Sequence, residues 1–356
     1  MKISDQEKKT AMTNDVVKQK QIFILNPLAA DQGSAVRGLG RFTKVVISSL
    51  KEAKVVSKND LGQLKSDNSI LIFPYLNWFS PNFFLKRYVS KQVLFIHDLI
   101  PLKYPEAFPK GIKASIFYKI NRFLFNKNID VVITDTFSVK KEIVKILNFP
   151  EEKIFVVYPA VDPVFFNQSR LPKDDFCLYV GDATFNKNLP FMAKVVKQAD
   201  LKLYLVGKVW ELLAGNQLDF SHPELSSLKE FSDLIASDSR FKIIGFVDDK
   251  QLKDLYRKAK VNLLLSLDEG FGYSTLEAGL QMTPSLISDI PVFREVVKDC
   301  ALYVDPTDLN SAVLRLKDLY YNDKINTELA EKIYKRAKEF SVENFGNRLR
   351  EIIVDL

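Results

Sequence analysis

Short apolar runs recur along the chain, and amphipathic segments of helical period, such as 40–53 and 138–148, lie between most of them. Buried strands that alternate with helices are typical of a parallel sheet covered on both faces. The runs predict two groups of strands, at 21–25, 70–73, 93–96, 130–134 and 154–158, and at 176–180, 201–207, 241–247, 261–266 and 285–288. The pattern therefore predicts an α/β protein with two parallel, doubly wound sheets.

A loop-like interval with several prolines, 158–175, separates the two groups of strands. At 356 residues the chain exceeds what one hydrophobic core usually organises, so two domains are expected. We predict a flexible lead-in at 1–20, an N-terminal Rossmann-like domain at 21–165 and a C-terminal Rossmann-like domain at 166–325. The last segment, 326–356, is expected to be helical throughout.

Composition and charge narrow the class of protein. Apolar residues make up 47% of the chain and charged residues 27%, as in ordinary soluble globular proteins. Residues 1–170 carry 26 Lys and Arg against 15 Asp and Glu, and residues 171–356 carry 25 against 29, so the net charge of +7 divides into +11 and −4. The basic part predicts an anionic partner, which could be nucleic acid, an acidic membrane surface or a phosphate-bearing substrate.

Cysteine usage and hydropathy indicate where the protein acts. Cys177 and Cys300 are far apart and have no metal-ligand spacing, which favours a reducing cytoplasm. The N-terminal segment lacks the apolar core of a signal peptide, and no run of about 18 uncharged apolar residues occurs. We therefore expect a cytoplasmic protein that does not span a bilayer.

Two glutamates, Glu269 and Glu277, flank a glycine-containing loop directly after a predicted strand. Gly270 and Gly272 permit tight turns and a close approach of a ligand to the main chain. Ser274 indicates the start of a helix, whose first turn would contain Glu277 and whose free amide groups form a site for phosphate. Two alternatives stay open: Ser274 and Glu277 could form a capping box, and Glu269 could be a solvated loop carboxylate.

This loop resembles the E-x7-E motif of a known family. Glu269-x7-Glu277 encloses GFGYSTL and continues as EAGLQMTPSLISDIPVFREVVKDCALYVDP, which resembles the retaining, nucleotide-sugar-dependent glycosyltransferases of the GT-B fold, family 4 or group 1. The resemblance covers nearly the whole chain from about Gln21. It implies two Rossmann-like domains facing a cleft, the first on the acceptor side and the second binding the nucleotide sugar, with terminal helices at 326–356 that cross back to the first domain.

The resemblance also implies roles for the residues of the loop. Glu269 would contact hydroxyl groups of the donor sugar as a catalytic residue, and Glu277 would hold the ribose of the nucleotide. The residues between them would line the donor site, where backbone amides receive the diphosphate. These residues are Gly270, Phe271, Gly272, Tyr273 and Ser274.

A second segment, VGDATFNKNLP at 180–190, resembles the phosphate-binding segment of the family. Gly181 and Lys187 would then contact the donor, with Lys187 as the cation on the diphosphate. Relatives often carry an arginine where this chain has Asp182 or Asn186, so the second cation expected of the family is missing there. Alternatively, Lys187 could be an exposed turn lysine.

The glycine loop ADQGSAVRGLGRF resembles the family's loop that approaches the donor phosphate and the acceptor. This implies donor contacts for Gly38 and Gly40 and makes Arg37 and Arg41 candidate anion contacts, unless the two arginines simply lie on a helix surface. The loop lacks the third glycine of a dinucleotide-binding fingerprint. A further family-like segment, GFVDDKQLKDLYRKAKV, would bring Val247 near the nucleotide base.

His97 ends a predicted strand in FIHDLIPLKYPE, which resembles the HD-x-x-P segment of bacterial mannosyltransferases. The resemblance implies that His97 is a second catalytic residue close to the donor sugar, and it favours GDP-mannose over UDP sugars as the donor. Because retention in this fold is thought to go by front-face attack assisted by the leaving phosphate, His97 need not be a general base. A structural His97–Asp98 pair is the alternative, and His222, in a polar insertion, is discounted.

The stretch 103–128 interleaves lysine and arginine with aromatic residues. It could lie on an acidic leaflet, as suits an acceptor anchored in lipid, or be an ordinary amphipathic helix with solvated lysines. No element that reads nucleic acid is recognisable, so a nucleic-acid partner is not expected.

The residues and the resemblance together predict a retaining hexosyltransferase, most simply a mannosyltransferase. It would move sugar from a nucleoside-diphosphate sugar to a glycan or lipid-linked acceptor in cell-surface polysaccharide synthesis, such as that of lipopolysaccharide. No metal and no cofactor besides the donor substrate are expected, and the expected place is the cytoplasm, at the inner face of the membrane. The alternatives are a GT-B sugar-nucleotide epimerase, a dinucleotide-dependent oxidoreductase and a non-catalytic, membrane-associated scaffold.

Overall fold

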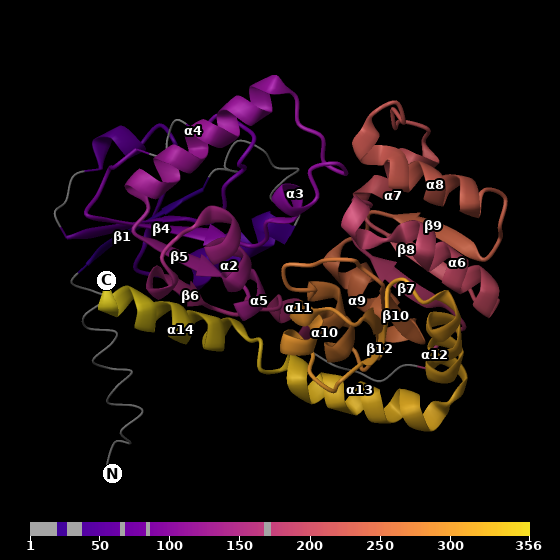
Figure 1. Ribbon diagram of the computed structural model, residues 1–356. Helices are drawn as coiled ribbons and strands as arrows, with labels where there is room; N and C mark the ends of the chain where they lie inside the picture. Colours follow the sequence, from indigo (N-terminus) through magenta and orange to yellow (C-terminus); the bar gives the residue numbers. More distant parts are fainter. Residues whose placement is uncertain (1–19, 27–37, 65–67, 83–85, 167–171) are drawn as a thin grey trace, which may run out of the picture. The chain divides into compact units, whose positions relative to one another are not determined.

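The computed structural model describes residues 20–26, 38–64, 68–82, 86–166 and 172–356, which form two compact units, each with its own parallel sheet (Figure 1). Unit 1 comprises the chain up to Leu99, Lys110–Asp162 and Phe340–Leu356. Unit 2 comprises Ile100–Pro109 and Pro163–Glu339. The chain therefore leaves unit 1 for ten residues directly after His97–Leu99.

The sheet of unit 1 has six parallel strands in the order β2-β1-β3-β4-β5-β6. They are β1 (Gln21–Leu25), β2 (Lys54–Val56), β3 (Ser69–Phe73), β4 (Lys91–Ile96), β5 (Val131–Thr134) and β6 (Ile154–Val156). Every residue of β3 and β5 is buried, as expected when helices cover both faces of a sheet.

The sheet of unit 2 also has six parallel strands, in the order β12-β11-β10-β7-β8-β9. They are β7 (Cys177–Val180), β8 (Leu203–Val206), β9 (Phe241–Gly245), β10 (Val261–Leu264), β11 (Ser285–Ser288) and β12 (Leu302–Val304). The strand order reverses between β7 and β10, which is the arrangement of a dinucleotide-type Rossmann sheet.

The strands predicted from the apolar runs all occur, several of them shorter by one to three residues. Two strands were not predicted, β2 and β12, and each lies at the edge of its sheet. Both have only three residues, so their apolar positions form no run that stands out from the surrounding loops.

Helices fill the connections of both sheets. In unit 1 they are α2 (Gly38–Ser49), α4 (Ile112–Asn128), α5 (Phe137–Glu142), α14 (Val342–Asp355), a π-helical turn (Ile143–Leu147) and 3₁₀ turns at Leu61–Gln63 and Glu151–Lys153. In unit 2 they are α3 (Ile100–Lys103), α6 (Leu189–Ala199), α7 (Lys208–Ala214), α8 (Ser226–Ile235), α9 (Asp249–Lys258), α10 (Tyr273–Leu280), α11 (Pro291–Val296), α12 (Leu309–Tyr321), α13 (Asp323–Ala337) and 3₁₀ turns at Pro163–Phe166, Phe185–Lys187 and Pro223–Leu225. No helix of the described ranges is both long and apolar enough to cross a membrane.

The prediction that 326–356 is helical throughout is wrong, because the helices are interrupted between Ala337 and Val342. Helix α13 ends at Ala337 and contacts α10 and α12 of unit 2, whereas α14 begins at Val342 after a break. Ser341 starts the new helix, because its Oγ accepts a hydrogen bond from Asn344 N at 3.2 Å.

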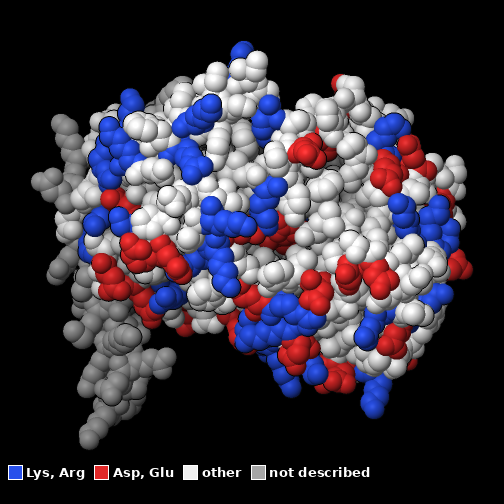
Figure 2. Space-filling model, viewed as in Figure 1, with Lys and Arg blue, Asp and Glu red and all other residues white. Residues whose placement is uncertain are grey.

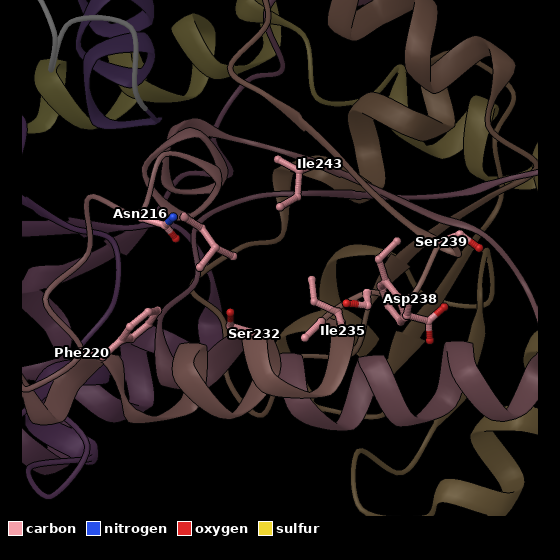
Figure 3. Close-up of a pocket in the computed structure, with 11 residues that line it drawn as sticks. Asn216, Phe220, Ser232, Ile235, Asp238, Ser239 and Ile243 are labelled. Carbon is pink, nitrogen blue, oxygen red and sulfur yellow. The ribbon is translucent and has the colours of Figure 1, made fainter.

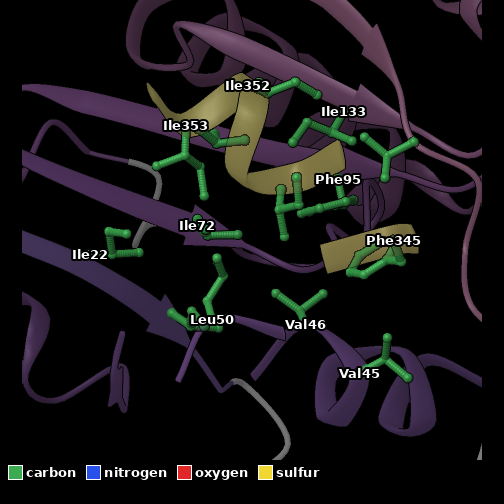
Figure 4. Packing of buried hydrophobic residues seen from close by; sticks show 14 of the residues in the cluster. Ile22, Val45, Val46, Leu50, Ile72, Phe95, Ile133, Phe345, Ile352 and Ile353 are labelled. Atoms are coloured by element: carbon green, nitrogen blue, oxygen red, sulfur yellow. The ribbon is translucent and has the colours of Figure 1, made fainter. Parts of the chain in front are cut away.

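The C-terminal helix α14 returns to unit 1, as the fold prediction expected. Phe345, Leu349 and Ile353 are buried in one cluster with residues of α2 and of the sheet, among them Phe42 and Phe95 (Figure 4). Lys20 also joins this end of the chain, since its Nζ donates to Val354 O at 2.9 Å. The rest of the lead-in predicted at 1–20 lies outside the described residues.

Candidate active site

In unit 2 two loops leave the sheet at the point where the strand order reverses. One follows β7 and contains Gly181 and the 3₁₀ turn that ends at Lys187, and the other follows β10 and contains Glu269. Strands β7 and β10 are paired neighbours. Ligands of open α/β sheets bind outside the carboxyl ends of the strands at such a point, so the fold brings both segments to the expected place.

Lys187 and Glu269 form an ion pair. Lys187 Nζ donates to Glu269 Oε1 at 2.6 Å, and Ser266 Oγ donates to the same oxygen at 2.7 Å. The side chains are 19% and 9% exposed, respectively. Lys187 is therefore not an exposed turn lysine and Glu269 is not a solvated loop carboxylate, which were the two structural alternatives.

Asn186 ties the two loops together. Its side-chain Nδ2 donates to Asp268 O at 2.9 Å, and its main-chain carbonyl oxygen accepts from Leu267 N at 2.7 Å. Asp268 in turn accepts from Glu269 N through Oδ1 at 2.9 Å. The position where relatives often carry an arginine thus holds a buried amide that fixes the backbone on which Glu269 stands.

Lys103 is a residue of this site that sequence reasoning missed. It lies in the segment Ile100–Pro109, which belongs to unit 2, and forms an ion pair with Asp268. Next to it, the ring of Tyr104 lies 5.7 Å from that of Phe185, between centroids. The sequence signal was Lys103 itself, five residues after Asp98, but the basic stretch 103–128 was interpreted as a single surface feature.

Gly272 shapes the start of helix α10. Its φ is +92°, and a Cβ at this position would lie 2.5 Å from Phe293 Cε1, so only glycine fits. Gly272 is the N-cap of α10, and no side chain makes a capping hydrogen bond there.

Glu277 forms no capping box with Ser274. It is the fifth residue of α10, hence in the second turn and not the first, and it is 6% exposed. The hydroxyl of Tyr256, a fully buried residue of α9, donates to Glu277 Oε2 at 2.9 Å. Tyr256 was also missed by sequence reasoning, although it stands in the family-like segment GFVDDKQLKDLYRKAKV.

Gly181 and Val247 lie on the loops that follow β7 and β9. The hydroxyl of Tyr179 folds back over Gly181 to donate to Asp182 O at 2.6 Å, and a Cβ on Gly181 would come within 2.9 Å of that hydroxyl oxygen. Val247 is partly buried, and its neighbour Phe246 donates its amide to Glu211 Oε1 at 3.0 Å.

In unit 1, His97 lies between acceptors from the two strands that flank its own. It follows β4, and its Nδ1 lies 3.0 Å and 2.9 Å from the two carboxylate oxygens of Asp135, which follows β5. Its Nε2 lies 3.0 Å from the carbonyl oxygen of Pro74, which follows β3. The side chain that pairs with His97 in this way is Asp135, which the sequence analysis did not select, and not Asp98.

The start of α2 lies close to His97. Gly38 and Gly40 form the first turn of this helix, and the ring of Phe42 meets the His97 ring edge-on, with centroids 4.4 Å apart. Arg37 lies outside the described residues. The described end of the glycine segment, from Gly38 to Phe42, and the histidine, which were predicted separately, are thus neighbours within unit 1.

Electrostatics give His97 an unusual proton affinity. Burial by itself would lower the pKa of the imidazole, but the Asp135 carboxylate and the hydrogen bonds to Asp135 and Pro74 outweigh it, so the pKa of His97 is raised. Asp98 adds to the increase. The ring therefore holds its protons more strongly than an ordinary histidine.

A pocket of about 480 Å³ lies in unit 2 beside β9, away from these loops (Figure 3). Phe220, Ile235 and Ile243 line it together with Asp238, whose pKa is lowered to about 2, chiefly by hydrogen bonds from Arg240. No predicted donor-binding residue is among its lining residues.

Metal ligands are not gathered in the part of the chain that the structure describes. No group of three or more His, Cys, Asp or Glu side chains there could hold a metal ion. Both cysteines are buried and free, and burial raises the pKa of the Cys177 thiol.

Comparison of the sequence with known proteins agrees with this geometry. The family model described as glycosyl transferases group 1 matches residues 162–340. The O-antigen chain mannosyltransferase RfbU of Salmonella typhimurium is 30% identical over 236 residues, which cover 65% of this chain and 61% of that protein. The O-antigen chain mannosyltransferase B of Escherichia coli is 23% identical over 275 residues, which cover 74% and 70%. The match thus spans less than two thirds of the Salmonella relative.

Solved structures share the fold of this chain. HepE of Anabaena, in complex with UDP and glucose, matches 95% of this chain and 100% of that chain with a TM-score of 0.68 at 14% identity. Sucrose-phosphate synthase from Thermosynechococcus elongatus matches 94% and 98% with a TM-score of 0.71 at 13% identity. WaaG, a glycosyltransferase involved in lipopolysaccharide biosynthesis, matches 93% and 99% with a TM-score of 0.63 at 13% identity. These likenesses confirm the predicted GT-B fold.

Proposed function

This chain belongs to the group 1 glycosyl transferases, and on that premise we propose that it transfers a mannosyl residue from a nucleoside-diphosphate sugar to a glycan or lipid-linked acceptor, with retention of anomeric configuration. The observation that carries the proposal is the bonded cluster of Lys187, Glu269 and Ser266 at the switch point of unit 2. The names of the Salmonella and Escherichia relatives, both O-antigen chain mannosyltransferases, support the sugar and a role in cell-surface polysaccharide synthesis.

Lys187 is assigned to the leaving diphosphate. Negative charge develops on the departing nucleotide in glycosyl transfer, and a positioned cation stabilises that transition state. An ammonium group has three N–H donors, and Glu269 receives one of them. The amide groups at the start of α10, behind Gly272, offer further donors for phosphate.

The two glutamates are assigned to the sugar and the ribose. Both hydrogen bonds to Glu269 end on Oε1, which leaves Oε2 to receive a hydroxyl group of the donor sugar. Tyr256 fixes one oxygen of Glu277 and so sets the orientation of a carboxylate that can accept from the vicinal hydroxyls of a ribose. His97 is assigned to the sugar, as the family resemblance implies.

The donor is tested by thermal unfolding of the full chain with GDP-mannose, UDP-glucose and ADP-glucose. A ligand at 100 times its dissociation constant stabilises the folded state by about 2.7 kcal/mol, and we expect that effect with GDP-mannose. A shift with UDP-glucose alone would contradict the mannosyl donor, and the absence of any shift would contradict nucleotide-sugar binding. The anomeric configuration of a transfer product, read by NMR coupling constants, tests retention.

We place the acceptor reaction at an anionic membrane surface on the cytoplasmic side, on account of α4. Ile112, Ile116 and Phe123 of this helix are 83%, 51% and 65% exposed. Helix α4 contains several lysines and arginines and no acidic residue. Figure 2 shows Lys and Arg side chains along the course of α4. Exposed apolar side chains among cations are typical of helices that lie on acidic leaflets.

The membrane contact is tested by sedimentation with vesicles of phosphatidylglycerol and of phosphatidylcholine. We expect binding to the anionic vesicles, reduced several-fold in the Ile116→Ser/Phe123→Ser variant. Leu314→Ser is the matched control, because Leu314 is 69% exposed on α12 of unit 2. Equal binding by all three proteins would exclude α4 as the contact.

A further inference from the structure

We propose that Asp135 is a positioning residue for His97. It holds the ring so that both nitrogens point protons at hydrogen-bond acceptors, and His97 therefore meets the donor sugar as a fixed N–H donor and not as a base. Nothing in the family match or the relatives' names assigns Asp135. The part that concerns the donor sugar rests on the proposed function, whereas the proton arrangement does not.

The contacts of the His97 ring determine which of its two nitrogens carry a proton. Nδ1 faces both carboxylate oxygens of Asp135, and Nε2 faces the carbonyl oxygen of Pro74, which can only accept a hydrogen bond. A neutral ring with its single proton on Nδ1 would set a lone pair of Nε2 against that carbonyl oxygen at 3.0 Å. Nε2 must therefore carry a proton, and the second proton lies between Nδ1 and Asp135.

Asp135 is held in place on both sides along the chain. Thr134 Oγ1 donates to Ile96 O at 2.7 Å, which joins the ends of β5 and β4 directly before the pair. Thr136 is the N-cap of α5, and its Oγ1 accepts from Val139 N at 3.2 Å. Asp135 is itself only 3% exposed. The carboxylate is thus preorganised between two locked neighbours.

Carboxylates and aromatic rings surround the His97 ring in the part of the chain that the structure describes. The charged groups that act on His97 are the carboxylates of Asp135 and Asp98, while α2 and β4 contribute the rings of Phe42 and Phe95. Burial raises the pKa of Asp135, and the carboxylates raise the pKa of His97, so the pair as a whole retains its shared proton. A retained proton on Nε2 is a hydrogen-bond donor that a sugar hydroxyl can share with Pro74 O while the ring stays in place.

The experiment uses the full chain with ¹⁵N-labelled histidine, which gives signals from only His97 and His222. The His222→Gln variant assigns them. We expect Nε2 of His97 to remain protonated from pH 6 to pH 8. In Asp135→Asn the side-chain amide can accept from Nδ1–H or donate to an unprotonated Nδ1, so no carboxylate holds the second proton and the ring should lose one of its two protons as the pH rises. A deprotonated Nε2 in the wild type at pH 7.5, or identical spectra for wild type and Asp135→Asn, would overturn the proposal.

Turnover supplies the second readout. We expect the kcat of Asp135→Asn to fall roughly 10-fold and to recover towards low pH, with Asp135→Glu closer to the wild type. Asp130→Asn is the matched control, because Asp130 precedes β5 at its other end and pairs with Arg87. A uniform loss at every pH would contradict the role of Asp135 in turnover. If the wild type transferred no sugar, the proposed function would fail, and the spectra would still decide the proton arrangement.

Discussion

A basic side chain pairs with a carboxylate at the carboxyl edge of each sheet, and the two pairs, Lys187–Glu269 and His97–Asp135, are built differently. In unit 2, Lys187 Nζ meets Glu269 Oε1 at 2.6 Å and has further donors to offer. In unit 1, His97 is held on both ring nitrogens, by Asp135 and by Pro74. The Lys187 ammonium group can therefore also bind an anionic ligand. The His97–Asp135 pair, by contrast, is arranged to retain its proton. The difference matches the roles that we propose, a leaving diphosphate for Lys187 and a neutral sugar for His97.

The largest effect is expected from Glu269→Gln, which removes the carboxylate of the exchangeable pair. We expect transfer to fall about 1,000-fold in kcat while nucleotide binding stays measurable, because the lost interaction stabilises the transition state. Transfer assays and thermal shifts with nucleotide measure the two effects. Glu230→Gln is the control, since Glu230 forms an exposed ion pair with Lys194. Turnover like that of the wild type would exclude Glu269 from the reaction.

Lys187→Met tests the cation of the same pair. Hydrogen bonds to charged groups contribute about 1.5–3 kcal/mol, so the affinity for the nucleoside diphosphate should fall roughly 10- to 100-fold. Titration calorimetry with the diphosphate measures it, and Lys194→Met provides a variant with the same substitution at an exposed ion pair. Unchanged affinity would mean that Lys187 serves only to hold Glu269.

Tyr256→Phe sharpens the contrast by testing a carboxylate, that of Glu277, which a tyrosine hydroxyl orients. Loss of one buried hydrogen bond to Glu277 should weaken nucleotide binding by about 1 kcal/mol, or roughly five-fold. Tyr303→Phe is the control, because the Tyr303 hydroxyl donates to the backbone oxygen of Phe293 at 3.1 Å.

Glu277→Gln completes that test. A variant that keeps its stability and loses nucleotide affinity would support the ribose contact. A loss of stability with unchanged affinity would instead make Glu277 a structural partner of Tyr256.

The smallest effect is the pH dependence of the pair in unit 1. The pKa of His97 is raised in the folded state, so its stabilising contribution is complete below the unfolded value of about 6.5 and is lost as pH rises through the folded pKa. Urea unfolding measures this effect. The free energy of unfolding of the wild type should exceed that of Asp135→Asn by the largest amount at the low-pH end of this window. Val139→Ala, which removes only buried apolar atoms, should differ from the wild type by a constant amount. A constant difference for Asp135→Asn as well would refute the raised pKa.

Much of the fold could be predicted because parallel strands buried on both faces leave uninterrupted apolar runs. The runs at 70–73 and 285–288 coincide with residues of β3 and β11. Edge strands such as β12 leave no such run, and the break between α13 and α14 depends on the single cap at Ser341. In the sequence alone, a serine that caps a helix cannot be distinguished from a serine within one.

The candidate site was predictable where its residues lie in contiguous motifs. Glu269 and Glu277 stand in one loop and helix, and Lys187 in a short segment after one strand. Asp135, Tyr256 and Lys103 were missed because each meets its partner across the fold: Asp135 is 38 residues from His97 and Tyr256 is 21 residues from Glu277. The position of Asp135 directly after a predicted strand next to that of His97 was the available signal.

The sequence by itself determined the two parallel sheets, the family and the residue types that we propose for a nucleotide-sugar site, because these follow from hydrophobic period and from local motifs. Only the tertiary structure decided the partners of those residues. Pairing at β7 and β10 brought Lys187 to Glu269, and pairing among β3, β4 and β5 brought Pro74 and Asp135 to the two nitrogens of His97. The physical reason is that strand order, which sets the neighbours of each loop, is a property of long-range packing and leaves no mark in any one segment.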